Sequence, residues 1–268
     1  FVVASADYIK SFDGPLRTFS FTPVLMPVYE HINDDFGKVD RLNFAGKTYF
    51  LLYDTDIDLI FLTGGSKTNR YGMDFSRNIT SNFEIHGELA FINDYEKRFI
   101  NSDGTVFDKE YDATSYLLGL RYLTKSDTTY IFEYFHDATG FAESEMTDYF
   151  SFINKGYDTY LTSGDDSLLK EASNAAGGSY NRKNPMRDYL YLRVSQKEPF
   201  DILYFTPSLT GIFNINDGSF SIGPELLYTG VKNLELRLRT TFLIGDSYTE
   251  YGEKLNDFWI GLRVRYYF

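Results

Sequence analysis

Cysteine, long apolar runs and surplus positive charge are all missing from this chain of 268 residues. Without cysteine, the chain forms no disulfide bonds. No uninterrupted apolar stretch reaches the ~18 residues of a membrane-spanning helix, which excludes a helical span on ordinary criteria. Lys and Arg number 26 against 38 Asp and Glu. The net charge of −12 argues against a nucleic-acid partner, since such a partner calls for clustered Lys and Arg.

Histidine is also scarce and occurs only as His31, His86 and His136. A histidine-dependent hydrolase needs a nucleophile within hydrogen-bond reach of the histidine and a third polar group that orients the ring. No His-x-Ser run accompanies His136, and Asp137 is only its neighbour in sequence. His86 lies in a row with two glutamates, where a histidine is more often a hydrogen-bonded polar residue than a ligand. The sequence therefore predicts no catalytic residue and no enzyme activity.

Aromatic residues, by contrast, are abundant: 25 Phe and 23 Tyr bring the aromatic content to 18%. Near the C-terminus they take part in a strict alternation. Every second residue from Phe258 to Phe268 is apolar, and Arg263 and Arg265 lie between them. A period of two predicts a β-strand with one apolar and one polar face. The same alternation recurs in four other segments: 83–91, 115–122, 220–229 and 234–244.

The connections between these segments have two lengths, which alternate along the chain. Short turns are expected at five places: 54–56, 80–82, 125–127, 197–199 and 231–233. Long polar loops are expected between them: 31–40, 64–69, 97–113, 138–185 and 246–256. Only 214–218 is short where a long loop is due. This alternation is typical of a strand meander that crosses a membrane, with the long loops outside.

The closing sequence WIGLRVRYYF, with a C-terminal Phe268 and alternate hydrophobic residues before it, resembles the bacterial outer-membrane β-barrel (porin-like) superfamily. The resemblance implies an all-β fold: a transmembrane, antiparallel, up-and-down β-barrel, multi-pass in the outer membrane of a Gram-negative bacterium. It implies contact with outer-membrane lipid and lipopolysaccharide. It also implies that the barrel-assembly machinery reads Phe268, Tyr266 and Val264 as its signal. The aromatic content fits the interfacial girdles of such barrels, and the lack of cysteine is compatible with assembly in the periplasm.

The number of strands bears on how much of such a barrel this sequence holds. The pattern gives about thirteen strands, whereas single-chain bacterial barrels have even numbers. The opening FVVASADYIKS has the pattern of the middle of a strand. We therefore expect 1–268 to be a single β-barrel domain, the C-terminal portion of a larger barrel. The full-length protein would have about 14 to 18 strands, and its N-terminal part is missing from this sequence.

Residues opposite the apolar rows should point into the barrel. The charged ones are predicted to line the lumen: Arg121, Arg193, Glu225, Glu235, Arg237, Arg239, Arg263 and Arg265. The last four arginines fall on adjacent strands. Two arrangements are open: a positive ladder that favours anionic solutes, or arginines neutralised by the lumen acids.

The segment 138–185 is long enough to have a function of its own. Met146, Tyr149, Phe150 and Ile153 recur at helical spacing after Ser144, which predicts a short helix with Ser144 as its N-cap. Three placements are open for this helix: a plug in the lumen, a lid or receptor patch on the outer surface, or packing against neighbouring loops.

The resulting functional prediction is a porin-like channel for passive diffusion of small hydrophilic solutes, with anions favoured. The alternative is a barrel that houses or secretes a protein partner, such as an electron-transfer or export complex. An outer-membrane hydrolase is a remote alternative. No cofactor is expected. The acidic loops lack a spaced calcium-loop signature, so no metal site is expected either.

Overall fold

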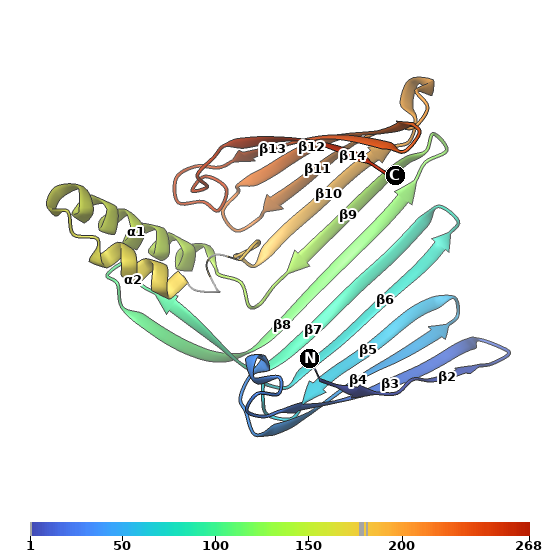
Figure 1. Ribbon diagram of the computed structural model, residues 1–268, viewed down its shortest axis with the longest axis horizontal. Coiled ribbons are helices and arrows are strands. Elements are labelled where there is room, and N and C mark those ends of the chain that lie inside the picture. The colour runs from blue at the N-terminus through green and yellow to red at the C-terminus, as the bar shows by residue number, and fades with distance from the viewer. Residues whose placement is uncertain (1, 177–179, 181) are drawn as a thin grey trace. The chain divides into compact units, whose positions relative to one another are not determined.

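In the part of the chain that the structure describes, fourteen strands form an antiparallel up-and-down sheet in which strands that follow one another in sequence are neighbours, except for the first two. The computed structural model describes residues 2–176, 180 and 182–268 (Figure 1). Within these residues the strand order begins at β1 (Ala4–Ser5) and ends at β14 (Phe258–Tyr266), and β1 and β2 (Tyr8–Ser11) both pair with β3 (Leu16–Val28). The prediction of an all-β antiparallel up-and-down sheet is therefore confirmed. No helix of the described chain combines the length and apolar composition needed to span a membrane.

The chain divides into two compact units. The N-terminal unit contains Phe1–Glu96 and Glu110–Leu118, and the C-terminal unit contains Lys97–Lys109 and Gly119–Phe268. Strands β7 (Phe83–Ile100) and β8 (Val106–Leu123) contribute residues to both units.

The sheet of the N-terminal unit has two chemically distinct faces. Its other strands are β1 (Ala4–Ser5), β2 (Tyr8–Ser11), β3 (Leu16–Val28), β4 (Arg41–Leu52), β5 (Thr55–Thr63) and β6 (Arg70–Thr80). In register, Leu59 lies opposite Met73, and Met73 lies opposite Leu89; all three are exposed. The next row on the other face places Asp58 opposite Asp74, and Asp74 opposite Glu88. Alternation therefore separates an apolar face from an acidic one.

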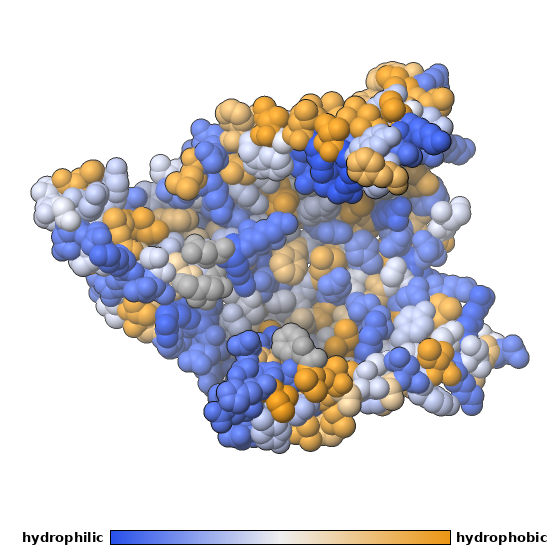
Figure 2. Space-filling view, viewed as in Figure 1, coloured by the Kyte–Doolittle hydropathy of each residue, from blue (hydrophilic) through white to orange (hydrophobic). Residues whose placement is uncertain are grey.

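The C-terminal unit repeats this separation. Its strands are β9 (Thr128–His136), β10 (Asp188–Gln196), β11 (Phe205–Asn214), β12 (Phe220–Val231), β13 (Leu234–Ile244) and β14 (Phe258–Tyr266). Leu226, Leu238 and Leu262 lie opposite one another on β12, β13 and β14. Figure 2 shows hydrophobic side chains gathered over one side of these three strands. The intervening positions carry the charged residues of the other face.

Several short turns lie within a residue or two of their predicted positions. Tyr53 and Asp54 connect β4 to β5, and both adopt left-handed backbone conformations, with φ of 49° and 57°. Such φ values are typical of the two-residue hairpins whose twist matches that of the flanking strands. The turn fixes which residues of β4 and β5 face each other, and therefore which side chains share a face.

One expectation about the connections is wrong. The loop predicted at 97–113 is mostly strand, because β7 continues to Ile100 and β8 starts at Val106. Arg98 and Asp108 form a two-point ion pair across this extension, with Nε–Oδ1 and Nη2–Oδ2 distances of 2.9 and 3.1 Å. Polar residues on both faces remove the alternation that marks a strand elsewhere.

The predicted helix is present but differs from the expectation. Helix α1 spans Glu143–Ser163 and begins after Ala142, so the prediction of Ser144 as N-cap is wrong. The Glu145 carboxylate accepts the Ala142 backbone N–H at 2.7 Å, which places Ser144 inside the first turn. A second helix, α2 (Ser167–Ala176), was not predicted. Two short 3₁₀ turns, η1 (Asp34–Phe36) and η2 (Pro199–Asp201), complete the elements.

Candidate functional site

The polar face of β12, β13 and β14 carries a connected network of arginines and glutamates, here called the arginine network. Its members are Glu225, Glu235, Arg237, Arg239, Arg263 and Arg265. Strand register brings them together: Glu225 lies opposite Arg239, Arg237 opposite Arg263, and Glu235 opposite Arg265.

Each carboxylate of the arginine network lies between two guanidinium groups. Arg239 Nε donates to Glu225 Oε2 at 2.7 Å, and Arg237 Nη1 lies 3.8 Å from Glu225 Oε1. Glu235 Oε1 accepts from Arg263 Nη2 at 3.2 Å and lies 3.6 Å from Arg237 Nη2. Arg265 reaches Glu235 through the Tyr267 hydroxyl, with successive distances of 3.4 and 3.5 Å. The result is an alternating chain of opposite charges across three strands.

Exposure shows which sign of charge this face presents. The Glu225 and Glu235 side chains are 11% and 14% exposed, whereas those of Arg239 and Arg263 are 48% and 47% exposed. Four arginines balance only two glutamates, which leaves a surplus of two positive charges. Among the described residues, the buried Arg237 Nε has no hydrogen-bond partner. The arginines therefore pair with the acids and still leave the face positive.

The two remaining predicted lumen arginines lie outside the arginine network. Arg193 on β10 donates instead to Thr210 Oγ1 and Ser208 Oγ, at 3.4 and 3.3 Å. It shares its face with the network, because Ser208 lies opposite Glu225 in register. Arg121 lies in β8, four strands before β12 in the strand order, and does not join the network.

The three residues of the predicted assembly signal lie at the end of the chain. Val264 and Tyr266 are more than half exposed, and Phe268 is fully exposed. The Tyr266 and Phe268 rings make an edge-to-face contact, with centroids 5.2 Å apart. These side chains are available to lipid or to another protein.

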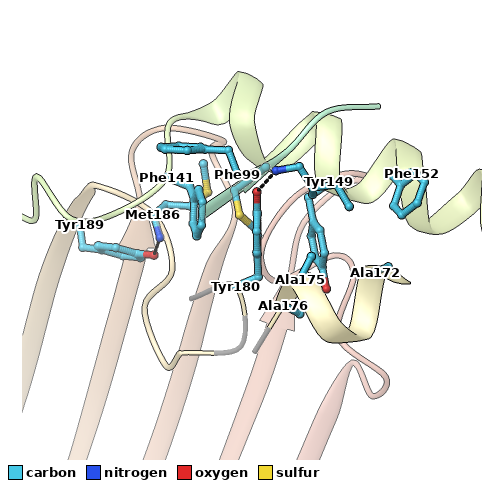
Figure 3. Packing of buried hydrophobic residues seen from close by; sticks show 12 residues of the cluster. Phe99, Phe141, Tyr149, Phe152, Ala172, Ala175, Ala176, Tyr180, Met186 and Tyr189 are labelled. Carbon is cyan, nitrogen blue, oxygen red and sulfur yellow. Dashed lines mark hydrogen bonds between the residues drawn. The ribbon is translucent and has the colours of Figure 1, made fainter. Parts of the chain in front are cut away.

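A buried aromatic cluster anchors the two helices to the strand ends of the C-terminal unit (Figure 3). Tyr180 is stacked between Phe141 and Tyr149, with centroid distances of 3.9 and 4.0 Å. The Tyr180 oxygen accepts the Ile100 backbone N–H at 3.1 Å. The cluster also contains Tyr189, which lies on the same face of β10 as Arg193. The helices are therefore anchored on the side of the sheet that carries the arginine network.

Lys97 is buried beside this cluster, 2% exposed. Its Nζ donates to Gly140 O at 2.6 Å and lies 3.3 Å from the centre of the Phe141 ring. It lies in the last part of β7, beyond Ile92, the last residue of β7 that pairs with β6. Burial lowers the pKa of Lys97 to about 7. Its ammonium is stabilised by ring faces and a carbonyl, since no ion pair involves it in the described chain.

Glu250 is a second buried ionisable group that the sequence did not reveal. It lies in the β13–β14 loop, is 2% exposed, and accepts from Tyr189 Oη at 2.7 Å and Asn214 Nδ2 at 2.9 Å through Oε2. Its Oε1 has no partner among the described residues. Burial raises the pKa of Glu250 to about 7. This carboxyl group ties the loop to the ends of β10 and β11.

His136 contacts an acid that is distant in sequence, Asp188. His136 Nδ1 lies 2.7 Å from Asp188 Oδ1, whereas Asp137 pairs with Arg182 at 3.0 Å. Asp188 also accepts from Tyr134 Oη at 2.6 Å and Asn216 Nδ2 at 3.0 Å. Within the described residues, no group of three or more His, Asp or Glu side chains is arranged to hold a metal ion.

No family model matches the chain, and neither does any curated protein or any solved structure.

Proposed function

We propose that the chain forms the wall of an outer-membrane β-barrel that acts as a channel for small hydrophilic solutes, with anions favoured. The observation that carries this proposal is the exposure of the apolar rows. Ile260 and Leu262 on β14 are 63% and 71% exposed, although the opposite face of the same strand carries arginines. A soluble two-layer fold would cover such a row with a second layer. A lipid-facing wall leaves it free of protein contacts and places the polar face toward water.

The anion preference rests on the arginine network. Its carboxylates are largely buried and its guanidinium groups are partly exposed, so a solute near this face meets a positive field. Inside a narrow pore with low-dielectric walls, such a field raises the local concentration of anions.

The test is conductance of the full-length protein in a planar lipid bilayer. Stable ohmic steps support the channel, whereas repeated insertion without conductance would overturn it and favour a barrel that houses a protein partner. Under a KCl gradient, the sign of the reversal potential decides the selectivity. We expect chloride to be the more permeant ion, and a cation preference would refute this part of the proposal.

A charge variant tests whether the arginine network is the cause. The combination Arg239→Gln, Arg263→Gln and Arg265→Gln leaves Arg237 against Glu225 and Glu235, and should weaken or reverse the anion preference. The matched control is Arg77→Gln, since Arg77 is an exposed arginine of β6 outside the network. An unchanged reversal potential in the triple variant would refute the role of the network.

A further inference from the structure

The N-terminal unit contains a pocket of about 560 Å³, here called the rim pocket. Four segments form its walls: Lys38 before β4, residues 65–70 at the β5–β6 connection, and the outer parts of β7 and of β8. Its volume falls in the range of roughly 300–1,000 Å³ that is typical of small-molecule sites. Neither the channel function nor the arginine network accounts for it.

Hydrogen bonds and close packing hold the walls of the rim pocket in place. The Lys38 N–H donates to Ser66 O at 2.9 Å. The buried Asn43 and Ser66 side chains are joined by an Nδ2–Oγ bond of 2.8 Å. A Cβ atom on Gly37 would lie 2.3 Å from Ser66 O, so only glycine allows these two loops to approach so closely. The Asn93 N–H donates to Asn69 O at 3.0 Å, which ties β7 to the same loop. The pocket is therefore built before any ligand arrives.

Charges of opposite sign lie on different walls of the rim pocket. The two loops and the start of β6 supply Lys38, Lys67 and Arg70, and the outer parts of β7 and β8 supply Asp94, Glu96 and Glu110.

None of these six side chains takes part in an ion pair with any residue that the structure describes. Lys67 Nζ lies 5.0 Å from the Phe36 ring centre, and the buried Arg70 Nε has no hydrogen-bond partner in the described chain. Unpaired charges of both signs around one cavity suit a ligand that carries both.

We propose that the rim pocket binds a small zwitterion, a molecule with an ammonium group and a carboxylate, such as an amino acid or a short peptide. The carboxylate would face the wall of Lys38, Lys67 and Arg70, and the ammonium group the acidic wall. A simple anion would leave the three carboxylates without a partner, and a simple cation would leave the three basic groups without one. A sugar site would call for exposed aromatic faces, whereas the single aromatic residue of the lining, Tyr95, makes an edge-to-face contact with Tyr111.

The test is calorimetric titration of the full chain, refolded in detergent micelles, with triglycine, acetate, methylammonium and glucose at equal ionic strength. Triglycine should bind at least ~10-fold more tightly than acetate or methylammonium, since each charge-assisted hydrogen bond contributes on that order. The affinities for diglycine and glycine, in which the ammonium group and the carboxylate lie closer together, then report the spacing between the two charged walls. Equal binding of acetate, tighter binding of glucose, or no binding of any glycine compound would overturn the proposal.

Two variants connect binding to the two walls. Arg70→Gln and Glu110→Gln should each weaken triglycine binding ~10-fold, and Glu110→Gln should also bring the affinities for triglycine and acetate closer together. Arg77→Gln, on the same strand as Arg70 but outside the lining, is the matched control and should bind like the wild type. Far-UV circular dichroism verifies that each variant is folded. Unchanged binding in both folded variants would refute the assignment.

Failure of this proposal is distinguishable from failure of the channel. Binding in micelles does not require a conducting pore, and conductance of KCl does not require the rim pocket. Conductance without triglycine binding would refute the zwitterion site alone, and binding without conductance would refute the channel alone.

Discussion

The buried charge of Lys97 gives the sharpest prediction: the free energy of unfolding should rise with pH above 7, and Lys97→Met should abolish that rise. Burial lowers the pKa of Lys97 from 10.5 to about 7. Between these values the unfolded chain still holds a proton that the folded chain has released. Because the unfolded state binds more protons in this window, stability increases with pH.

The magnitude follows from the width of that window. Each pH unit between the two pKa values changes the free energy of unfolding by ~1.4 kcal/mol. Between pH 7 and 9.5 the wild type should therefore gain about 3 kcal/mol relative to Lys97→Met, after allowance for partial titration near pH 7. The Gly140 carbonyl keeps a hydrogen bond in the variant, because Arg187 Nε also donates to it, at 3.2 Å.

The assay is urea unfolding in detergent micelles at pH 7 and pH 9.5, followed by fluorescence of the single tryptophan, Trp259. The matched control is Lys155→Met, which removes an exposed lysine of α1 and should keep the wild-type dependence on pH. The argument would be refuted if the free energy of unfolding changed by the same amount between pH 7 and pH 9.5 in the wild type and in Lys97→Met.

Three further predictions concern other parts of the chain. Glu225→Gln should increase the preference for chloride in reversal-potential measurements and lower the free energy of unfolding by ~2 kcal/mol, because two guanidinium groups lose their shared carboxylate. Burial raises the pKa of Glu250 from 4.5 to about 7, so the stability it contributes is fully present below pH 4.5 and lost as the pH rises through 7. Protease cleavage within 245–257 should therefore be faster at pH 8 than at pH 6, and Glu250→Gln should show no such difference. Gly37→Ala should lower the free energy of unfolding by ~1–3 kcal/mol, and with it the melting temperature, because the added Cβ meets the backbone carbonyl of Ser66. Gly72→Ala, whose Cβ makes only ordinary contacts, should change the melting temperature little.

Alternation in the sequence was sufficient to predict the strands whose two faces differ in chemistry. Leu234–Ile244 and Phe258–Tyr266 lie close to their predicted bounds, because apolar and charged residues alternate there without interruption. The same pattern placed the members of the arginine network on one face. It could not show that the glutamates are buried between guanidinium groups, because that depends on side-chain conformations across three strands.

The remaining features depend on contacts between distant segments. The ends of β7 and β8 are polar on both faces, so period two is lost although the strands continue. Lys97 and Glu250 lie in polar stretches where nothing local marks burial; the aromatic stack over one and the Tyr189 hydroxyl beside the other come from segments far away in sequence. The rim pocket likewise combines four separate stretches of chain, and only their folding brings its charges to one place.

The register of the last two strands places one carboxylate between two facing arginines. Arg237 lies directly opposite Arg263, a pairing of like charges that repels the two strands. Glu235 contacts both guanidinium groups and converts this repulsion into attraction. A two-residue slip of β14 would keep the apolar residues on their face but would place Gly261 or Arg265, in place of Arg263, opposite Arg237. Hydrophobicity alone accepts either alignment, and in the observed one the Glu235 carboxylate offsets the repulsion between the two facing arginines.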